Sequence, residues 1–212
     1  MTQSQRLLPL FPLPNVVLFP GVPLPLHIFE SRYRAMVADA LEGDRRIVMV
    51  MLKPGFETDY EGRPPIFPIG CSGVIVHAAK LEDGRYNIVL NGLERVRVIE
   101  EDHERPYRCA IVEPLPDASS DADETTAVRA LRSRLETFAS VKDLPKDAAQ
   151  RLREMPDTDF VHAMAMALDL EPLEKQAVLE QATLGLRAQA LVDLLEMHRL
   201  AESARTKSTR PN

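Results

Sequence analysis

The spacing of apolar residues divides the chain into a first half typical of strands and a second half typical of helices. In the first half the apolar runs are short and are separated by proline, glycine or charged residues. The predicted strands are Arg6–Leu10, Val16–Phe19, Val22–Phe29, Ile47–Leu52, Ile69–Leu81, Arg85–Asn91, Arg95–Glu100 and Tyr107–Val112. Ile47–Leu52 is apolar without interruption, so we expect it to be buried on both faces.

One helix is predicted among these strands. From Ser31 to Glu42 the apolar residues recur three and four positions apart, which places them in one stripe at helical period. We expect Glu30 or Ser31 to cap its start and Gly43 to end it in the left-handed conformation. Further along, Asp83-Gly84 lies between two strand-like runs and predicts a hairpin.

The second half follows a polar linker and is helical in pattern. Apolar residues recur at helical spacing from Val128 to Phe138 and again from Phe160 to Leu168, where Asp157 is expected to be the cap. Pro172 is expected in the first turn of a further helix. A last helix is predicted over Gln189–Ala201. The predicted domains are a β-rich part at 1–117, a helical part at 118–205 and a flexible tail at 206–212. Strands followed by helices indicate the α+β class.

Prolines interrupt the first apolar stretch at six positions. They stand at positions 9, 12, 14, 20, 23 and 25. Because proline donates no ladder hydrogen bond, these segments should be edge strands, bulges or strand ends. The same prolines exclude the helical core of a signal peptide, and no run is long enough to span a bilayer. We therefore expect a soluble cytoplasmic protein.

Composition narrows the classes of ligand. The formal net charge of the 212 residues is -6, which is not the basic excess that phosphate binding usually requires. The chain has two cysteines, Cys71 and Cys109, so free thiols are expected in place of a disulfide framework. Two Cys–His pairings, Cys71 with His77 and His103 with Cys109, have poor spacing for one ion, and no metal site is predicted.

Four motifs, in order, carry a resemblance to a known family. Leu8–Val37 contains V-V-L-F-P-G and then P-L-x-I-F-E-x-R-Y, and Ile69-Gly70-Cys71 follows. Next come Asp83-Gly84-Arg85 with Asn91-Gly92-Leu93-Glu94-Arg95, and finally Tyr107–Leu115. Together they resemble the amino-terminal substrate-binding domain of Lon proteases over most of the chain, so the chain looks like a free-standing copy of that domain.

The resemblance implies both a fold and a ligand. It implies a PUA-like β pseudo-barrel with one inserted helix, followed by a C-terminal helical bundle. It also implies a non-catalytic module that binds unfolded or tagged proteins and acts as an adaptor in protein quality control. A separate protease or chaperone would then be a further partner. No cofactor, nucleic acid or membrane is expected as a ligand, and self-association stays open.

Two absences argue against Lon-type chemistry. The sequence contains no G-x-x-x-x-G-K-[ST], so it lacks the loop that holds the phosphates of ATP. Lon peptidases use a serine–lysine pair, with the serine in P-K-D-G-P-S-A-G. Pro145-Lys146-Asp147-Ala148 copies only the first three residues of that motif, without its serine. We interpret this fragment as a helix start and predict no catalytic residue.

A module for unfolded chains needs exposed apolar surface, and either a groove or a free strand edge. The segment from Pro20 to Tyr33 combines apolar mass with prolines that keep it from being wholly used by the sheet. Phe19, Leu26 and Ile28 are expected in the core, a core position is also favoured for Phe29 and Tyr33, and a structural hydrogen bond is favoured for His27 and Arg95. The candidate polypeptide-binding residues are Pro20, Leu24, Pro25, His27, Phe29, Tyr33 and Arg95.

Two other functions stay open at this point. PUA-like barrels often hold RNA, although the acidic balance and low aromatic content speak against it here. An enzyme with its site between the barrel and the helices would need converging titratable groups. The sequence shows no such cluster clearly.

Overall fold

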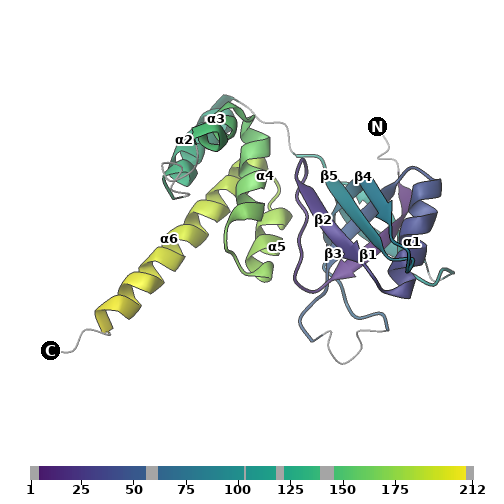
Figure 1. Ribbon diagram of the computed structural model, residues 1–212. Coiled ribbons are helices and arrows are strands. Elements are labelled where there is room, and N and C mark those ends of the chain that lie inside the picture. The colour runs from purple at the N-terminus through teal and green to yellow at the C-terminus, as the bar shows by residue number, and fades with distance from the viewer. Residues whose placement is uncertain (1–4, 56–61, 103, 118–121, 139–145, 209–212) are drawn as a thin grey trace. The chain divides into compact units, whose positions relative to one another are not determined.

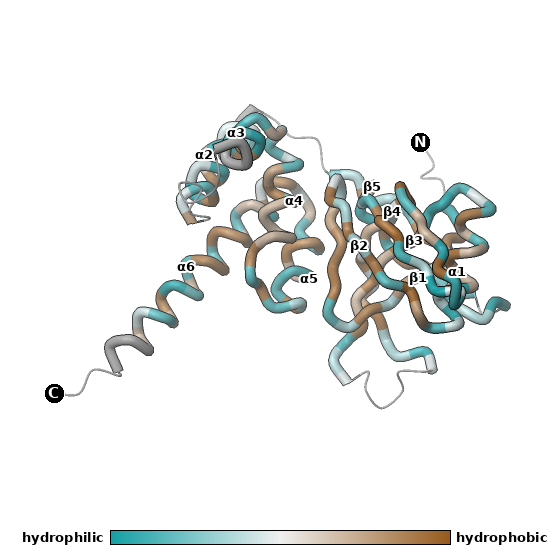
Figure 2. The backbone as a smooth tube through the Cα atoms, viewed as in Figure 1, coloured by the Kyte–Doolittle hydropathy of each residue, from teal (hydrophilic) through white to brown (hydrophobic). Residues whose placement is uncertain are grey.

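The computed structural model describes residues 5–55, 62–102, 104–117, 122–138 and 146–208 (Figure 1). The strands are β1 (Arg6–Leu13), β2 (Pro23–Ile28), β3 (Arg46–Met51), β4 (Ile69–Lys80), β5 (Tyr86–Asp102) and β6 (Cys109–Pro114). The helices are α1 (Ser31–Glu42), α2 (Ala122–Phe138), α3 (Lys146–Glu154), α4 (Asp157–Ala167), α5 (Pro172–Glu180) and α6 (Leu184–Ser208). Apolar segments lie on the strands and also on helices such as α4 and α6, whereas the turns between the strands are mostly polar (Figure 2).

The strands form one mixed sheet that closes almost into a ring. Their order is β2-β5-β4-β3-β1-β6, and β6 also pairs with the second part of β5. Among these strands β1 and β3 run parallel, and the other pairs are antiparallel. The long β5 replaces the two strands predicted over Arg85–Asn91 and Arg95–Glu100. The α+β fold with an inserted helix is confirmed.

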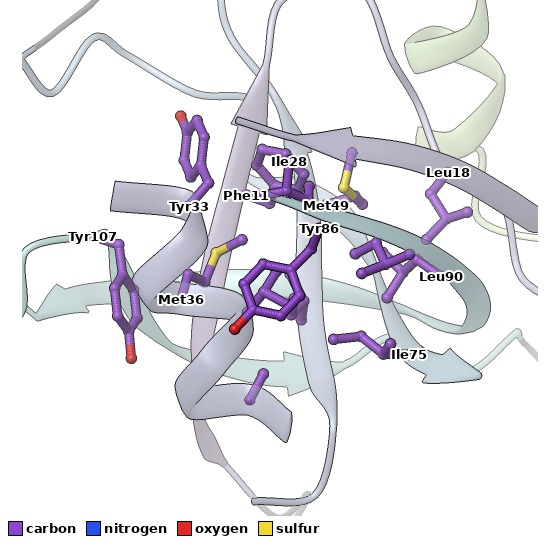
Figure 3. Packing of buried hydrophobic residues seen from close by; sticks show 14 of the residues in the cluster. Phe11, Leu18, Ile28, Tyr33, Met36, Met49, Ile75, Tyr86, Leu90 and Tyr107 are labelled. Carbon is purple, nitrogen blue, oxygen red and sulfur yellow. The ribbon is translucent and has the colours of Figure 1, made fainter. Parts of the chain in front are cut away.

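The core of this sheet has two clusters that share β1 and β3. The larger one packs the apolar stripe of α1, including Tyr33 and Met36, against Phe11 and Met49 (Figure 3). The smaller one is formed by alternate residues of the same strands and of β5 and β6. Residues 47–52 are at most 3% exposed, because their side chains fill both clusters. The prediction that this strand is buried on both faces is confirmed.

By its contacts the chain divides into two compact units. The β-rich unit comprises Met1–Pro116 with Glu171–Leu179, and the helical unit comprises Asp117–Leu170 with Glu180–Asn212. Most of α5 therefore belongs to the β-rich unit. Gln176 Nε2 donates to the Ile69 carbonyl at 2.9 Å, and Arg95 Nη1 donates to the Leu179 carbonyl at 3.1 Å. The boundary expected near residue 117 stays a prediction.

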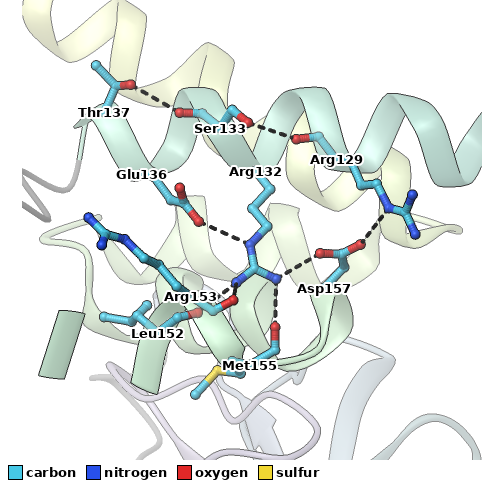
Figure 4. Close-up of polar contacts among 9 residues, drawn as sticks. All are labelled: Arg129, Arg132, Ser133, Glu136, Thr137, Leu152, Arg153, Met155 and Asp157. Atoms are coloured by element: carbon cyan, nitrogen blue, oxygen red, sulfur yellow. Dashed lines mark hydrogen bonds and ion pairs between the residues drawn. The ribbon is translucent and has the colours of Figure 1, made fainter. Parts of the chain in front are cut away.

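In the helical unit, Arg132 of α2 holds the end of α3 to the start of α4 (Figure 4). Its guanidinium donates to the carbonyls of Leu152 at 2.7 Å, Arg153 at 3.0 Å and Met155 at 2.6 Å. It also pairs with Asp157 at 2.8 Å and lies 4.4 Å from the centroid of the Phe160 ring. One largely buried side chain thus satisfies the carbonyls that a helix C-terminus leaves without partners.

Several local expectations are wrong. Gly43 has a φ of -104°, and the left-handed residue after α1 is Arg45, with a φ of 62°. Val16–Phe19 was predicted as a strand but forms none. The cap residue of α4 is Pro156, and Asp157 lies in the first turn with its carboxylate on Arg132.

Other expectations are confirmed. Ser31–Glu42 is helical at the predicted bounds, the Asp83-Gly84 hairpin forms with a φ of 80° at Gly84, and Pro172 opens α5. α3 begins at Lys146, as the helix-start interpretation expected. Helix α6 continues through Ser208, past the predicted start of a tail at 206, and residues 209–212 lie outside the described residues.

Candidate functional site

Strand β2 lies at one end of the strand order, and its side chains alternate between core and solvent. The residues that point inward are Leu24, Leu26 and Ile28. Pro23, Pro25 and His27 point outward and are exposed, and so is Phe29 just after the strand. We call these four exposed residues the β2 face. Of the residues expected in the core, Phe19, Ile28 and Tyr33 are buried and Leu26 is half-buried. The core position favoured for Phe29 is wrong, because this residue follows the end of β2 and its ring lies beside the exposed His27.

The backbone edge of β2 has few hydrogen-bond donors to offer. Antiparallel partners alternate between pairs that exchange backbone hydrogen bonds and pairs that do not. The N–H of Gly92 donates to the Val22 carbonyl at 3.0 Å, so the even-numbered residues of β2 face β5. The odd-numbered backbone groups then face outward, and Pro23 and Pro25 have no N–H there. This edge is a poor template for another strand.

His27 is fixed on the β2 face by two hydrogen bonds. Arg85 Nη1 lies 3.1 Å from His27 Nε2, and His27 Nδ1 lies 2.7 Å from Asn87 Oδ1. Because a guanidinium only donates, Nε2 accepts and the proton sits on Nδ1, which donates to Asn87. Asp83 holds Arg85 in turn, at 2.6 Å. Both ring nitrogens of His27 are therefore hydrogen-bonded, in agreement with the structural hydrogen bond expected for it.

Phe29 is the aromatic group that this surface presents to solvent. Its side chain is 61% exposed, and its ring stacks near His27 with the centroids 6.2 Å apart. On the same face Pro25 lies opposite the half-buried Val89 of β5, which lies opposite His77 of β4. The surface thus combines apolar and imidazole groups across three strands, as a site for apolar side chains requires.

The other candidate residues are buried or half-buried, and two of them make hydrogen bonds within the fold. Tyr33 is 4% exposed, and its hydroxyl donates to the Pro12 carbonyl at 3.4 Å. Arg95 is 5% exposed and donates to α5, which confirms the structural hydrogen bond expected for it. Pro20 and Leu24 are half-buried. The structure therefore brings Pro25, His27 and Phe29 together on one exposed surface and leaves Tyr33 and Arg95 largely covered.

A cavity of about 200 Å³ lies at the start of α1, and the sequence did not predict it. We call it the arginine pocket. Its lining residues are Pro12, Arg32, Tyr33, Gly62, Arg63, Pro106, Tyr107 and Arg108. These residues come from four separate segments of the β-rich unit, so no local motif could have revealed the pocket.

Tyr107, at the rim of this pocket, belongs to a polar cluster with α1. Its hydroxyl donates to Asp39 Oδ2 at 2.7 Å, and Arg105 Nη1 lies 2.9 Å from that hydroxyl. Burial, and then the hydrogen bond to the Asp39 carboxylate, raise the pKa of Tyr107 to about 12. Both factors favour the neutral phenol, which donates to a carboxylate that a phenolate would repel.

The raised pKa of Tyr107 predicts a loss of stability in alkali. An unfolded tyrosine loses its proton near pH 10, whereas the folded one keeps it to about pH 12. The stabilisation is therefore complete below pH 10 and is lost as the pH rises to 12. Urea unfolding between pH 9 and 12 should show a steeper fall in unfolding free energy for the wild type than for Tyr107→Phe. Parallel curves would contradict this assignment.

No metal or thiol chemistry emerges from the described residues. Within them, no three His, Cys, Asp or Glu residues are grouped as a metal site would require. His103, considered as a ligand, lies outside them. Cys71 is fully buried, and burial raises the pKa of its thiol far above the usual value. None of the helices in the described part of the chain is long and apolar enough to cross a membrane.

Comparisons with known proteins agree on one family. Residues 7–197 match the family model of the ATP-dependent protease La (LON) substrate-binding domain. Lon protease 2 of Myxococcus xanthus is 32% identical over 200 residues, which are 92% of this chain and 24% of that protein. Lon protease 2 of Syntrophobacter fumaroxidans is 31% identical over 173 residues, or 81% of this chain and 22% of that protein. The chain thus spans about a quarter of the length of these relatives.

Solved structures support the same fold. The N-terminal domain of Mycobacterium avium complex Lon protease superposes with a TM-score of 0.70 at 16% identity, covering 91% of this chain and 100% of that one. A Lon N-terminal domain protein from Xanthomonas campestris gives a TM-score of 0.59 at 20% identity, covering 89% and 98%. At these identities the similarity establishes the architecture, and the binding surface has to be argued from this chain's own residues.

Proposed function

This chain belongs to the family of LON substrate-binding domains, and from that premise we propose that it binds unfolded polypeptides on the β2 face without altering them. The observation that carries the proposal is the exposed Phe29 beside Pro25 and the fixed His27. An aromatic ring left in water next to a rigid, partly apolar strand is a surface that gains free energy when an apolar side chain covers it.

The edge of β2 favours one mode of binding over another. A peptide that added as a further strand would leave its carbonyls unpaired opposite Pro23 and Pro25. Such unpaired groups cost free energy once they are removed from water. A bound chain therefore lies across the side chains of the face, and its apolar residues contact Phe29 and Val89. Recognition of this kind depends on apolar content more than on a fixed sequence.

The expected affinity is modest. Burying the exposed 61% of a side chain of roughly 200 Å² removes about 120 Å² of apolar surface from water, worth up to about 3 kcal/mol at roughly 25 cal/mol per Å². The ordering of a flexible partner offsets part of this gain. A weak and reversible contact suits a module that passes unfolded chains to a separate protease or chaperone, which is the adaptor role we propose.

Catalysis is not part of the proposed role. The sequence has neither the phosphate-binding loop nor the serine motif of a Lon enzyme, as described above. The four residues of the β2 face include no hydroxyl or thiol nucleophile, and both ring nitrogens of His27 are used in hydrogen bonds with Arg85 and Asn87. The face can hold a chain but offers no group that would attack a peptide bond.

Replacing Phe29 with alanine tests the surface directly. We expect binding of a dye-labelled, reduced and carboxymethylated protein, followed by fluorescence anisotropy without ATP, to weaken about tenfold, since most of the apolar contact is lost. The matched control is Leu7→Ala, which removes an apolar side chain that is 52% exposed on β1 of the same unit. Equal loss of binding in both variants, or no loss in Phe29→Ala, would exclude the β2 face as the binding surface.

A further inference from the structure

The arginine pocket is strongly cationic for a protein of negative net charge. Arg32, Arg63 and Arg108 line it, and among the described residues of the lining there is no carboxylate. The remaining walls are the rings of two tyrosines and two prolines together with Gly62. Guanidinium groups against apolar rings form a surface that fits a small anion carrying an apolar group.

The guanidinium groups are already held in position. Arg108 is 7% exposed and makes a two-point contact with Glu101, at 2.8 Å and 2.5 Å. Its Nη1 donates to the Pro64 carbonyl at 2.8 Å. Arg32 pairs with Glu30 at 3.0 Å, and its guanidinium carbon lies 4.7 Å from the centroid of the Tyr33 ring. Little side-chain entropy would therefore be lost when an anion binds here.

Among the described residues, the ion pairs around the pocket leave an excess of positive charge. Glu101 is the carboxylate partner of both Arg108 and Arg63, the latter at 3.7 Å. Asp102 turns its carboxylate to the backbone N–H of Glu104 at 3.0 Å and lies outside the lining. One carboxylate thus serves two guanidinium groups. Each guanidinium carries five N–H donors, and the contacts of Arg108 described above do not use all of them.

We propose that the arginine pocket binds a carboxylate of the bound polypeptide, either that of its C-terminus or that of an acidic side chain; the inference rests on the function proposed above. A volume of about 200 Å³ equals roughly seven water molecules at about 30 Å³ each, which suits a carboxylate with one small side chain. It is below the range of about 300–1,000 Å³ typical of sites for larger ligands. Phe29 of the β2 face precedes Arg32 by three residues, so both sites lie at the corner between β2 and α1.

Three dye-labelled peptides of one apolar sequence distinguish the sources of the carboxylate. The first ends in a free C-terminal carboxylate, the second is amidated, and the third is amidated with one internal glutamate. We expect the amidated neutral peptide to bind about tenfold more weakly than at least one of the other two, because a charge-assisted contact is lost. A preference for the first assigns the pocket to chain ends, and a preference for the third assigns it to acidic side chains.

Arg63→Gln is the decisive variant, because Arg63 is half-buried and its contacts are longer than those of Arg108. It should abolish the preference for carboxylate and leave binding of the amidated peptide unchanged. Arg97→Gln is the matched control, since Arg97 is exposed on β5, pairs with Glu113 at 3.8 Å and does not line the pocket. Arg32→Gln, with circular dichroism of every variant, provides a second test if Arg63→Gln is poorly folded.

The outcomes separate this inference from the proposed function. If the wild type binds all three peptides equally, or if Arg63→Gln weakens all three alike, the pocket does not recognise carboxylate and only the inference fails. If the wild type binds none of the peptides and no unfolded protein, both the proposed function and this inference are wrong. If Arg97→Gln removes the preference as fully as Arg63→Gln, the effect belongs to net charge and the pocket assignment is wrong.

Discussion

Replacing Gly92 with alanine should lower the free energy of unfolding of the β-rich unit by about 3 kcal/mol or more. A Cβ at this position would lie 2.1 Å from the Phe19 carbonyl oxygen and 2.9 Å from its carbon, both backbone atoms that cannot rotate away. The backbone of β5 or of the Phe19 turn would have to move. That movement would strain the hydrogen bonds by which Gly92 holds Gly21, at 2.9 Å, and Val22, at 3.0 Å. Overpacking and weakened hydrogen bonds each cost about 1–3 kcal/mol.

Gly43→Ala is the matched control for this variant. Its added Cβ would meet its nearest atom at 3.7 Å, an ordinary contact, and its φ of -104° lies outside the left-handed region. Urea unfolding followed by tyrosine fluorescence should therefore show a much lower midpoint for Gly92→Ala and little change for Gly43→Ala. Similar midpoints for Gly92→Ala and the wild type would refute the close approach between β5 and the Phe19 turn.

Removing the side chain of Arg132 should destabilise the helical unit by about 3 kcal/mol. In Arg132→Ala the carbonyls of Leu152, Arg153 and Met155 lose their donor at the end of α3, and Asp157 loses its ion pair. The ring of Phe160 also loses the guanidinium above it. Leaving carbonyls without a donor and breaking a largely buried ion pair are among the single changes that lower the free energy of unfolding most.

The control for Arg132 is one helical turn away. Arg129 also contacts Asp157, at 3.9 Å, but its side chain is 74% exposed, and an exposed pair contributes little. Hydrogen–deuterium exchange should therefore show faster exchange across α3 and α4 in Arg132→Ala and nearly unchanged exchange in Arg129→Ala. If the two variants exchange alike, the network around Arg132 does not stabilise these helices.

The sequence correctly predicted the elements whose pattern of apolar and polar residues is set within one short segment of the chain. The stripe of α1 and the uninterrupted apolar run of β3 each follow a single local pattern, so the type of both elements was correct. The bounds of α1 were also correct, and those of β3 lie one residue earlier than predicted. The continuity of β5 was missed, because Gly92 interrupts the apolar alternation and only pairing with β2 and β6 shows that the strand continues. The end of α1 was also misjudged, since Arg45 rather than Gly43 adopts the left-handed conformation.

The residues that carry the family resemblance prove to be mostly structural. A Cβ on Gly70 would lie 2.3 Å from the Met49 carbonyl oxygen, Gly92 meets Phe19 in the same way, and Arg95 ties α5 to the sheet. Such motifs identify the fold because the fold requires them. They report less about the ligand: Tyr33 and Arg95, two candidate contact residues taken from these motifs, are buried.

The exposed part of the site was within reach of sequence reasoning, and the arginine pocket was not. Alternation along β2 places Pro25, His27 and Phe29 on one side once the strand is known to lie at an edge, which its prolines indicate. The pocket depends on closure of the sheet, which brings Arg63 and Arg108 to Arg32 across long separations in sequence. No periodic pattern in the sequence indicates that these three arginines lie close together.

The central claim is that the β2 face binds unfolded polypeptide without chemistry. The most direct measurement is a titration of an unlabelled apolar peptide into the isotope-labelled chain without ATP, followed by two-dimensional NMR and by mass spectrometry of the peptide. We expect saturable shifts of the amides of Leu24, Leu26 to Phe29 and Asn87 to Val89, with the peptide intact at the end. Absence of shifts at millimolar peptide, shifts confined to the helical unit, or cleavage of the peptide would contradict the account.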